Sequence, residues 1–213
     1  MFRKLVVGAG VALTAMCSPI ALGAGVAAAA PPNVTLSGAI NCTATGVVKF
    51  SGPLTNTNPS NQVSVSVKLK LAKCTGPGTI SGPVTLTRGT LVGTSAPDTM
   101  LNACGTISST TPLPTITGTI TWKGKKGTVT SSAVTIQGAS GFYEQGANEL
   151  HVALPTTIGS GSYAGQSTSF TGLDSNKSGY VVTSTCSGKK GLKSFTIGRP
   201  AGTVTGSLAI VGG

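Results

Sequence analysis

The chain has 213 residues and is rich in glycine but poor in charge: 31 residues are glycine, 9% are charged, and the formal net charge is +11. Four acidic residues and one histidine provide few groups that transfer protons, so we expect no enzyme. The length suits one domain and is too short for two comfortable ones.

The first thirty residues have the pattern of a secretory signal peptide. A basic start is followed by an apolar run from Leu5 to about Leu22 and then by small residues. Signal peptidase requires small residues before the cut and accepts proline poorly after it, so we expect cleavage after Ala29. The predicted organisation is a signal peptide at 1–29 and a single secreted all-β domain at 30–213, without a transmembrane helix in the mature chain.

From Val34 onward, apolar or β-branched residues alternate with polar ones. The clearest segment is Gln62–Lys73, in which valine and leucine alternate with serine and lysine. Six further segments share this alternation: Thr115–Trp122, Gly127–Ile136, Glu149–Leu154, Tyr180–Cys186, Lys193–Ile197 and Thr203–Ile210. Glycine-rich turns such as Lys123–Gly127 and Gly138–Gly141 separate them. We therefore predict an all-β fold, an antiparallel β-sandwich or flattened barrel of about 10–12 short strands.

The predicted mature domain keeps four cysteines, Cys42, Cys74, Cys104 and Cys186. Their spacing matches no metal site, and an even number in an exported chain indicates two disulfide bonds. Four cysteines allow three pairings. Of these we favour Cys74–Cys104, across a local loop, together with Cys42–Cys186, which would tie the first strand region to a late one.

The residues able to perform acid–base chemistry are Asp98, Glu144, Glu149, His151 and Asp174. A glycosidase needs two facing carboxylates, but the glycines around Glu144 predict a turn there, so we do not expect it to pair with Glu149. A serine hydrolase would need His151 as its base and a Gly-x-Ser-x-Gly segment, which the sequence lacks. Glu149 and His151 share one strand face and are expected to form a surface pair, because no second histidine is present to complete a metal site.

Two further motifs are interpreted as structural. The segment Gly159–Gly165 lacks the Gly-Lys-Ser/Thr ending of a phosphate loop, so it predicts a hairpin. Trp122 ends an alternating strand and is expected to anchor the core, although one half of a sugar-stacking platform is the alternative. We predict no catalytic residue, no metal and no cofactor.

Lysine is concentrated in three clusters: Lys68, Lys70 and Lys73; Lys123, Lys125 and Lys126; and Lys189, Lys190 and Lys193. One interpretation is that they keep a Ser/Thr-rich β protein in solution and protect its edge strands. The other is that they share one side of the domain and attract an anionic polymer or lipid surface. A nucleic acid is not expected as partner, because stacking aromatic residues are scarce.

Several short motifs carry a family resemblance. They are Asn41-Cys42, Phe50-Ser51-Gly52-Pro53-Leu54-Thr55, Lys73-Cys74-Thr75-Gly76, Cys104, Gly118-Thr119-Ile120-Thr121-Trp122, the segment Gly159–Gly165, and Cys186 with Gly191-Leu192-Lys193. In this order they resemble secreted, uncharacterised all-β proteins of actinobacteria, of the mycobacterial and rhodococcal type. The resemblance implies export, disulfide bonds and a β fold, and it implies no activity.

Three functions follow as hypotheses. The first is a secreted or cell-envelope-associated, non-enzymatic β protein that acts by surface contact. The second is a binding module for an anionic envelope glycan or lipid headgroup. The third is an outer-envelope β-barrel, although the lysine and serine face of the best strand does not favour it.

Overall fold

The structure is a computed structural model that describes residues 30–55, 62–98, 114–138, 140–144, 149–171, 188, 190–198 and 206–210. The chain divides into two units, Met1–Ala30 and Pro31–Gly213, and every element described below belongs to the second unit.

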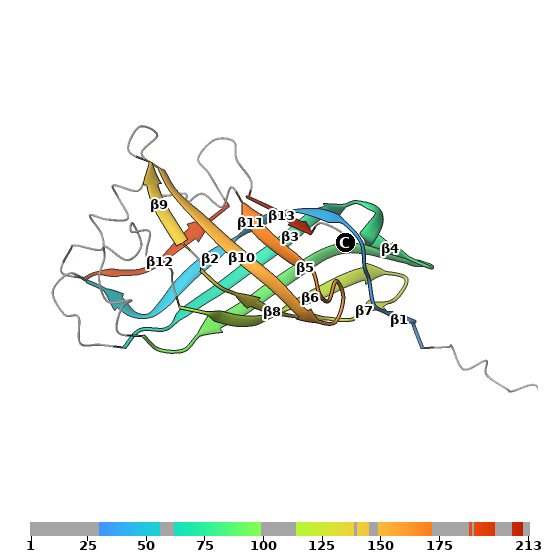
Figure 1. The fold of residues 1–213 in the computed structure, drawn as a ribbon, viewed down its shortest axis with the longest axis horizontal. Coiled ribbons are helices and arrows are strands. Elements are labelled where there is room, and N and C mark those ends of the chain that lie inside the picture. Colours follow the sequence, from blue (N-terminus) through green and yellow to red (C-terminus); the bar gives the residue numbers. More distant parts are fainter. Residues whose placement is uncertain are drawn as a thin grey trace, which may run out of the picture. The chain divides into compact units, whose positions relative to one another are not determined.

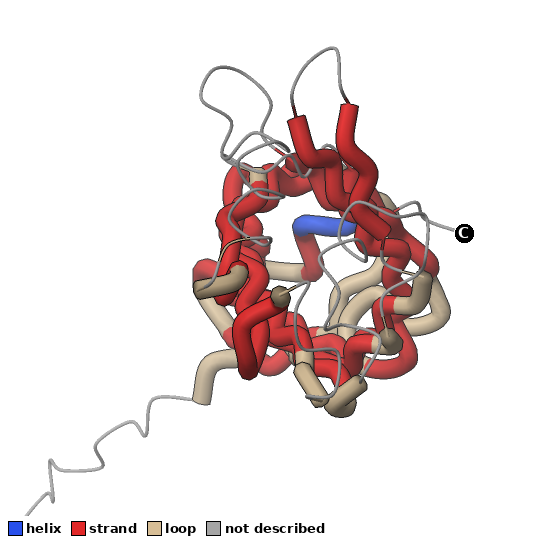
Figure 2. Tube along the Cα trace, turned by 90° about the vertical axis from the view of Figure 1, so that its left-hand side faces the viewer, coloured by secondary structure: helices blue, strands red, loops and turns tan. Residues whose placement is uncertain are grey.

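Eight antiparallel strands close into a barrel (Figure 1). In their order around the barrel, they are β2 (Ile40–Leu54), β3 (Val65–Thr75), β5 (Val84–Ser95), β6 (Ile116–Lys125), β8 (Ser132–Ile136), β10 (Glu149–Ser160), β11 (Ser167–Thr171) and β13 (Gly206–Ile210). The ring closes because β11 pairs with both β10 and β13, and Figure 2 shows the strands surrounding the interior. The barrel is the second of the two architectures predicted from the sequence.

Shorter elements extend this wall. β9 (Ser140–Glu144) and β12 (Leu192–Ile197) pair with β10 and β2, respectively, and β4 (Ile80–Ser81) pairs with β5. β1 (Asn33–Val34) runs parallel to β7 (Thr128–Val129), so the start of the second unit is fixed along the barrel. A single 3₁₀ turn, η1 (Pro77–Thr79), precedes β4.

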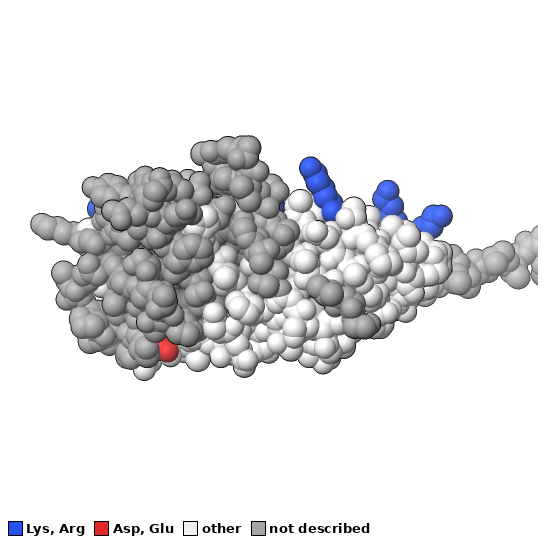
Figure 3. Space-filling model, turned by 45° about the horizontal axis from the view of Figure 1, so that its top comes forward, with Lys and Arg blue, Asp and Glu red and all other residues white. Residues whose placement is uncertain are grey.

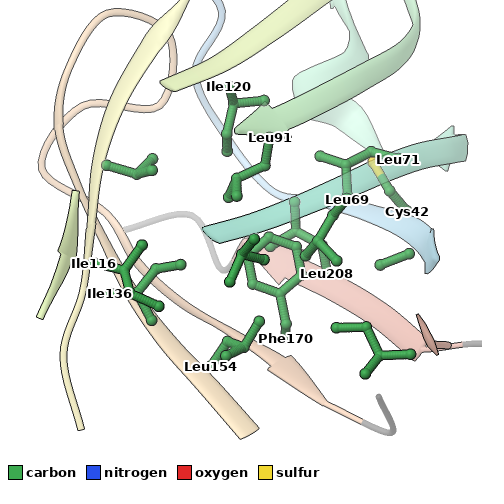
Figure 4. Packing of buried hydrophobic residues seen from close by; sticks show 14 of the residues in the cluster. Cys42, Leu69, Leu71, Leu91, Ile116, Ile120, Ile136, Leu154, Phe170 and Leu208 are labelled. Carbon is green, nitrogen blue, oxygen red and sulfur yellow. The ribbon is translucent and has the colours of Figure 1, made fainter. Parts of the chain in front are cut away.

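Strict alternation decides which side chains fill the barrel. In β3, Val65, Val67, Leu69 and Leu71 are buried, whereas Lys68 and Lys70 are exposed. Leucine, isoleucine and phenylalanine from the other strands meet them inside, as Figure 4 shows. An eight-stranded barrel is just wide enough for such side chains to fill, so the described interior is an apolar core.

A buried cluster closes one end of this core. The Tyr163 side chain is 0% exposed, and its hydroxyl donates to the Gly78 carbonyl oxygen over 2.8 Å. The ring packs edge-on against Trp122, with the centroids 5.3 Å apart, and the Trp122 Nε1–H donates to Ser132 Oγ over 2.7 Å. The Tyr163 N–H also donates to the Leu36 carbonyl oxygen, so the segment before β2 forms part of the closure.

Gly89 makes room for this cluster. It lies on β5 directly opposite Trp122, and an added Cβ would come within 2.7 Å of the indole ring. Any larger residue would force Trp122 away from Tyr163, which explains the glycine at this position of the strand.

The disulfide bond differs from both predicted pairings. Cys42 bonds to Cys74, so neither Cys74–Cys104 nor Cys42–Cys186 forms. The cause is local: the β2–β3 register shifts between Asn41 and Thr43, and Lys73 adopts a left-handed φ of 51°. The extra residue in β3 brings Cys74 beside Cys42, an adjustment typical of a β-bulge. Cys104 and Cys186 lie outside the described residues.

Most predicted strands are present, with changed bounds. Gln62–Lys73 corresponds to β3, Thr115–Trp122 to β6, Lys193–Ile197 to β12 and Thr203–Ile210 to β13, while Gly127–Ile136 contains β7 and β8. Glu149–Leu154 is the first half of β10, which continues through Pro155 to Ser160. Four strands were not predicted, β2, β5, β9 and β11, and the predicted segment Tyr180–Cys186 lies outside the described residues.

Candidate functional site

Two adjoining depressions lie on the outer face of β2 and β3. Their volumes are about 210 and 230 Å³. Val47 and Lys68 line both of them, Lys49 lines the first, and Lys70 lines the second. Both are smaller than a pocket for a drug-sized ligand, so they suit a charged group or a segment of a chain.

The strand register explains why the lysines meet there. Lys68 on β3 lies between Val47 on β2 and Val92 on β5, and Lys70 lies between Thr45 and Thr90. Lys49 pairs with Ser66, two residues before Lys68 on β3. Paired residues of an antiparallel sheet point to the same side, so the three ammonium groups share one surface.

Within the part of the chain that the structure describes, no carboxylate forms an ion pair with Lys49, Lys68 or Lys70. Among the described residues, nothing neutralises their positive charge, and a concave surface lined by charges of one sign concentrates the electrostatic potential.

The second lysine cluster continues this surface. Lys123 and Lys125 alternate along the outer face of β6, and Arg88 on β5 lies directly opposite Lys123. Figure 3 shows described Lys and Arg side chains projecting mainly along one edge of the surface in view. Lys68 and Lys70 on β3 therefore share one wall of the barrel with Lys123 and Lys125 on β6, and β5 lies between the two strands.

The remaining predicted lysines lie outside the two depressions. Lys73 occupies the bulge beside the disulfide bond, and Lys126 lies in the turn after β6 with a φ of 61°. Lys190 is exposed before β12, and Lys189 lies outside the described residues. Lys193 is exposed at the start of β12, beside Ser194, which pairs with Lys49. None of these lines either depression.

Two cations of this surface were missed by the sequence analysis, Lys49 and Arg88. Each is a single charge outside the predicted clusters, and each lies on a strand that was not predicted. The alternation of Val48, Lys49 and Phe50 was the available signal for Lys49.

The acid–base residues are placed differently from the prediction in one respect. Glu144 ends β9 and is not in a turn, and the register pairs it with Glu149 on β10. The side chains of Glu144 and Glu149 lie outside the description, as does Asp174. His151 is half-buried and pairs with Phe142. No group of three His, Cys, Asp or Glu residues that could hold a metal ion occurs among the described residues.

The aromatic residues of the core are structural. Trp122 is 3% exposed, which confirms the prediction that it anchors the core. Burial raises the pKa of the Tyr163 hydroxyl above its ordinary value, because the interior disfavours the charged phenolate. Gly159–Gly165 forms the predicted hairpin between β10 and β11, and Ser162 Oγ accepts a hydrogen bond from the Leu36 N–H.

Comparisons with protein-family models, with curated proteins and with solved structures gave no match. No helix among the described residues is long and apolar enough to cross a membrane.

Proposed function

We propose that this chain is an exported, non-enzymatic protein that binds an anionic group of the cell envelope on the outer face of β2 and β3. One observation carries the proposal: Lys49, Lys68 and Lys70 surround two adjoining depressions. The signal-like segment at 1–29 and the resemblance to secreted actinobacterial proteins support export. The scarcity of acidic residues and histidine supports a role without catalysis.

The depressions favour binding over unspecific surface contact. Charges that serve only to keep a protein in solution need no common location, whereas these three lysines come from two strands and meet at a concave surface. Ser66 and Thr45 lie among them and can donate hydrogen bonds to anionic oxygens.

The direction of the side chains argues against the outer-envelope barrel. Such a barrel carries an apolar band outside and polar residues inside. The described strands have the opposite arrangement, with the apolar core inside and lysine, serine and threonine outside. Ile80 and Val92 are the exposed large hydrophobic residues among those described.

A titration with two small probes tests the proposal. We expect the protein to bind a galacturonic acid dimer or glycerol phosphate weakly at low salt, and less at physiological salt, because exposed charges are screened. The double variant Lys68→Gln with Lys70→Gln should lose most of this binding. The control Lys126→Gln with Lys190→Gln removes the same charge at two exposed positions outside both depressions and should retain it. If both double variants lose binding equally, binding depends only on the net charge of the protein, and the proposed site is refuted.

A further inference from the structure

Six basic residues form a diagonal row across four neighbouring strands, which we call the basic diagonal: Lys49 on β2, Lys68 and Lys70 on β3, Arg88 on β5, and Lys123 and Lys125 on β6. Building on the proposed function, we propose that its ligand is an extended acidic polysaccharide that binds along this row.

The register gives the path of the row. From Lys49 the path crosses to β3 at Ser66, follows β3 through Lys68 to Lys70, and crosses to β5 at Thr90. Arg88 lies two residues from Thr90 and directly opposite Lys123, and Lys125 follows on β6. Each step is one strand across, two residues along, or both. With a strand spacing of about 4.8 Å and a rise of about 3.4 Å per residue, the row spans roughly 30 Å.

This geometry selects a chain over a compact anion. A single phosphate or carboxylate contacts at most two or three of these cations, and it leaves the others without a counter-charge. A linear polymer with regularly spaced acidic groups can neutralise all six, and its contacts along the row then act together.

Repulsion between the cations of the row lowers the stability of the fold. Like charges directly opposite each other in an antiparallel sheet are destabilising, and Arg88 and Lys123 are such a pair. No ion pair with these six residues is present in the described part of the chain, so nothing described there offsets the repulsion. A row of cations that lowers stability is explained if it is occupied by an anionic ligand.

The neighbours of the row indicate a sugar polymer. Hydroxyl groups lie directly opposite several of its cations: Ser66 opposite Lys49, Thr90 opposite Lys70, and Thr85 opposite Lys125. Val47 and Val92, the latter 50% exposed, flank Lys68 and can contact the C–H face of a sugar ring. The described aromatic rings of Phe50, Trp122, Tyr163, Phe170 and Phe195 are buried, so they offer no stacking surface to nucleotide bases.

Oligomers of galacturonic acid, from the dimer to chains longer than the row, test this inference by calorimetric titration of the whole protein. We expect the affinity to rise with length by on the order of tenfold or more and then to level off once the oligomer spans the row. The variant Lys123→Gln with Lys125→Gln should weaken binding of the long oligomer and leave the dimer unaffected. The control Lys190→Gln, outside the row, should change neither, and unchanged Trp122 emission would show that each variant is folded.

The possible negative results distinguish failure of the extended ligand from failure of the anion site. If dimer and long oligomer bind equally, and the Lys68 and Lys70 variant still abolishes binding, the extended ligand is wrong and the proposed anion site stands. If vesicles of phosphatidylglycerol bind and the oligomers do not, the ligand is a lipid surface and the inference is overturned. If no oligomer, glycerol phosphate or vesicle binds, both proposals fail.

Discussion

The Trp122 side chain and its neighbours form a buried, hydrogen-bonded cluster at one end of the barrel. Its indole N–H donates to Ser132 Oγ, and Ser132 Oγ in turn donates to the Ser162 carbonyl oxygen. Tyr163 contributes its ring to the indole and its hydroxyl to Gly78. Each of these buried polar groups has a partner, so the cluster stabilises the core and fixes one arrangement of it.

The substitution Tyr163→Phe should lower the free energy of unfolding by about 1–2 kcal/mol, because the Gly78 carbonyl oxygen loses its buried donor. The pH dependence should change as well. Burial raises the pKa of Tyr163 in the folded state, so its contribution to stability is complete below about pH 10, the ordinary value for tyrosine, and is lost as the pH rises further. Urea unfolding followed by Trp122 fluorescence between pH 8 and 11 measures both effects. The variant should show a shallower decline than the wild type above pH 10, and an identical decline would contradict this account.

Strands with regular alternation were predictable from the sequence, and irregular ones were not. Every second residue of β3 from Val65 to Leu71 is apolar, so its pattern is unmistakable. The inward positions of β2 include Ala44 and Gly46, whose small size weakens the apolar signal. Pro155 hid the second half of β10: proline normally ends a strand, but here it lies where β10 changes partner from β9 to β8, so the missing N–H costs little.

The candidate site was predictable only in part, for a related reason. Lys68 and Lys70 were identified because both lie in the clearest strand. Lys49 and Arg88 become their neighbours only through the register of β2, β3 and β5, and the alternation of each strand alone does not reveal which residues of two strands pair. The disulfide pairing was wrong for the same cause, since it depends on the bulge at Lys73.

The bond between Cys42 and Cys74 connects residues 32 positions apart and joins the two neighbouring strands that form the depressions. On the loop-entropy model it stabilises the fold by roughly 3–4 kcal/mol. Mass spectrometry of a digest without reductant should therefore show the Cys42 and Cys74 peptides linked to each other. If the domain holds two disulfide bonds, as predicted, Cys104 is then linked to Cys186. A link from Cys74 to Cys104, or from Cys42 to Cys186, would contradict the structure.

The interior of the barrel stabilises the fold, and its outer surface is free to bind. Its apolar side chains fill the interior, which leaves function to the outer surface, and the outer surface of β2, β3, β5 and β6 carries the basic diagonal. Lys68 and Lys70 lie where β3 is paired on both sides, and Lys123 pairs with Arg88 on β5, so the backbone positions of these residues are fixed before any ligand arrives. A rigid wall of this kind lowers the entropic cost of binding an extended partner.

Binding along the basic diagonal is tested most directly by nuclear magnetic resonance. The chemical shift of each backbone amide is followed while a long galacturonic acid oligomer is added. The predicted result is that shifts follow the row from Lys49 through Lys68, Lys70 and Arg88 to Lys125, while amides on β8 and β10 remain unchanged. Shifts that gather on β8, β10 or β12 and spare β3 would contradict it.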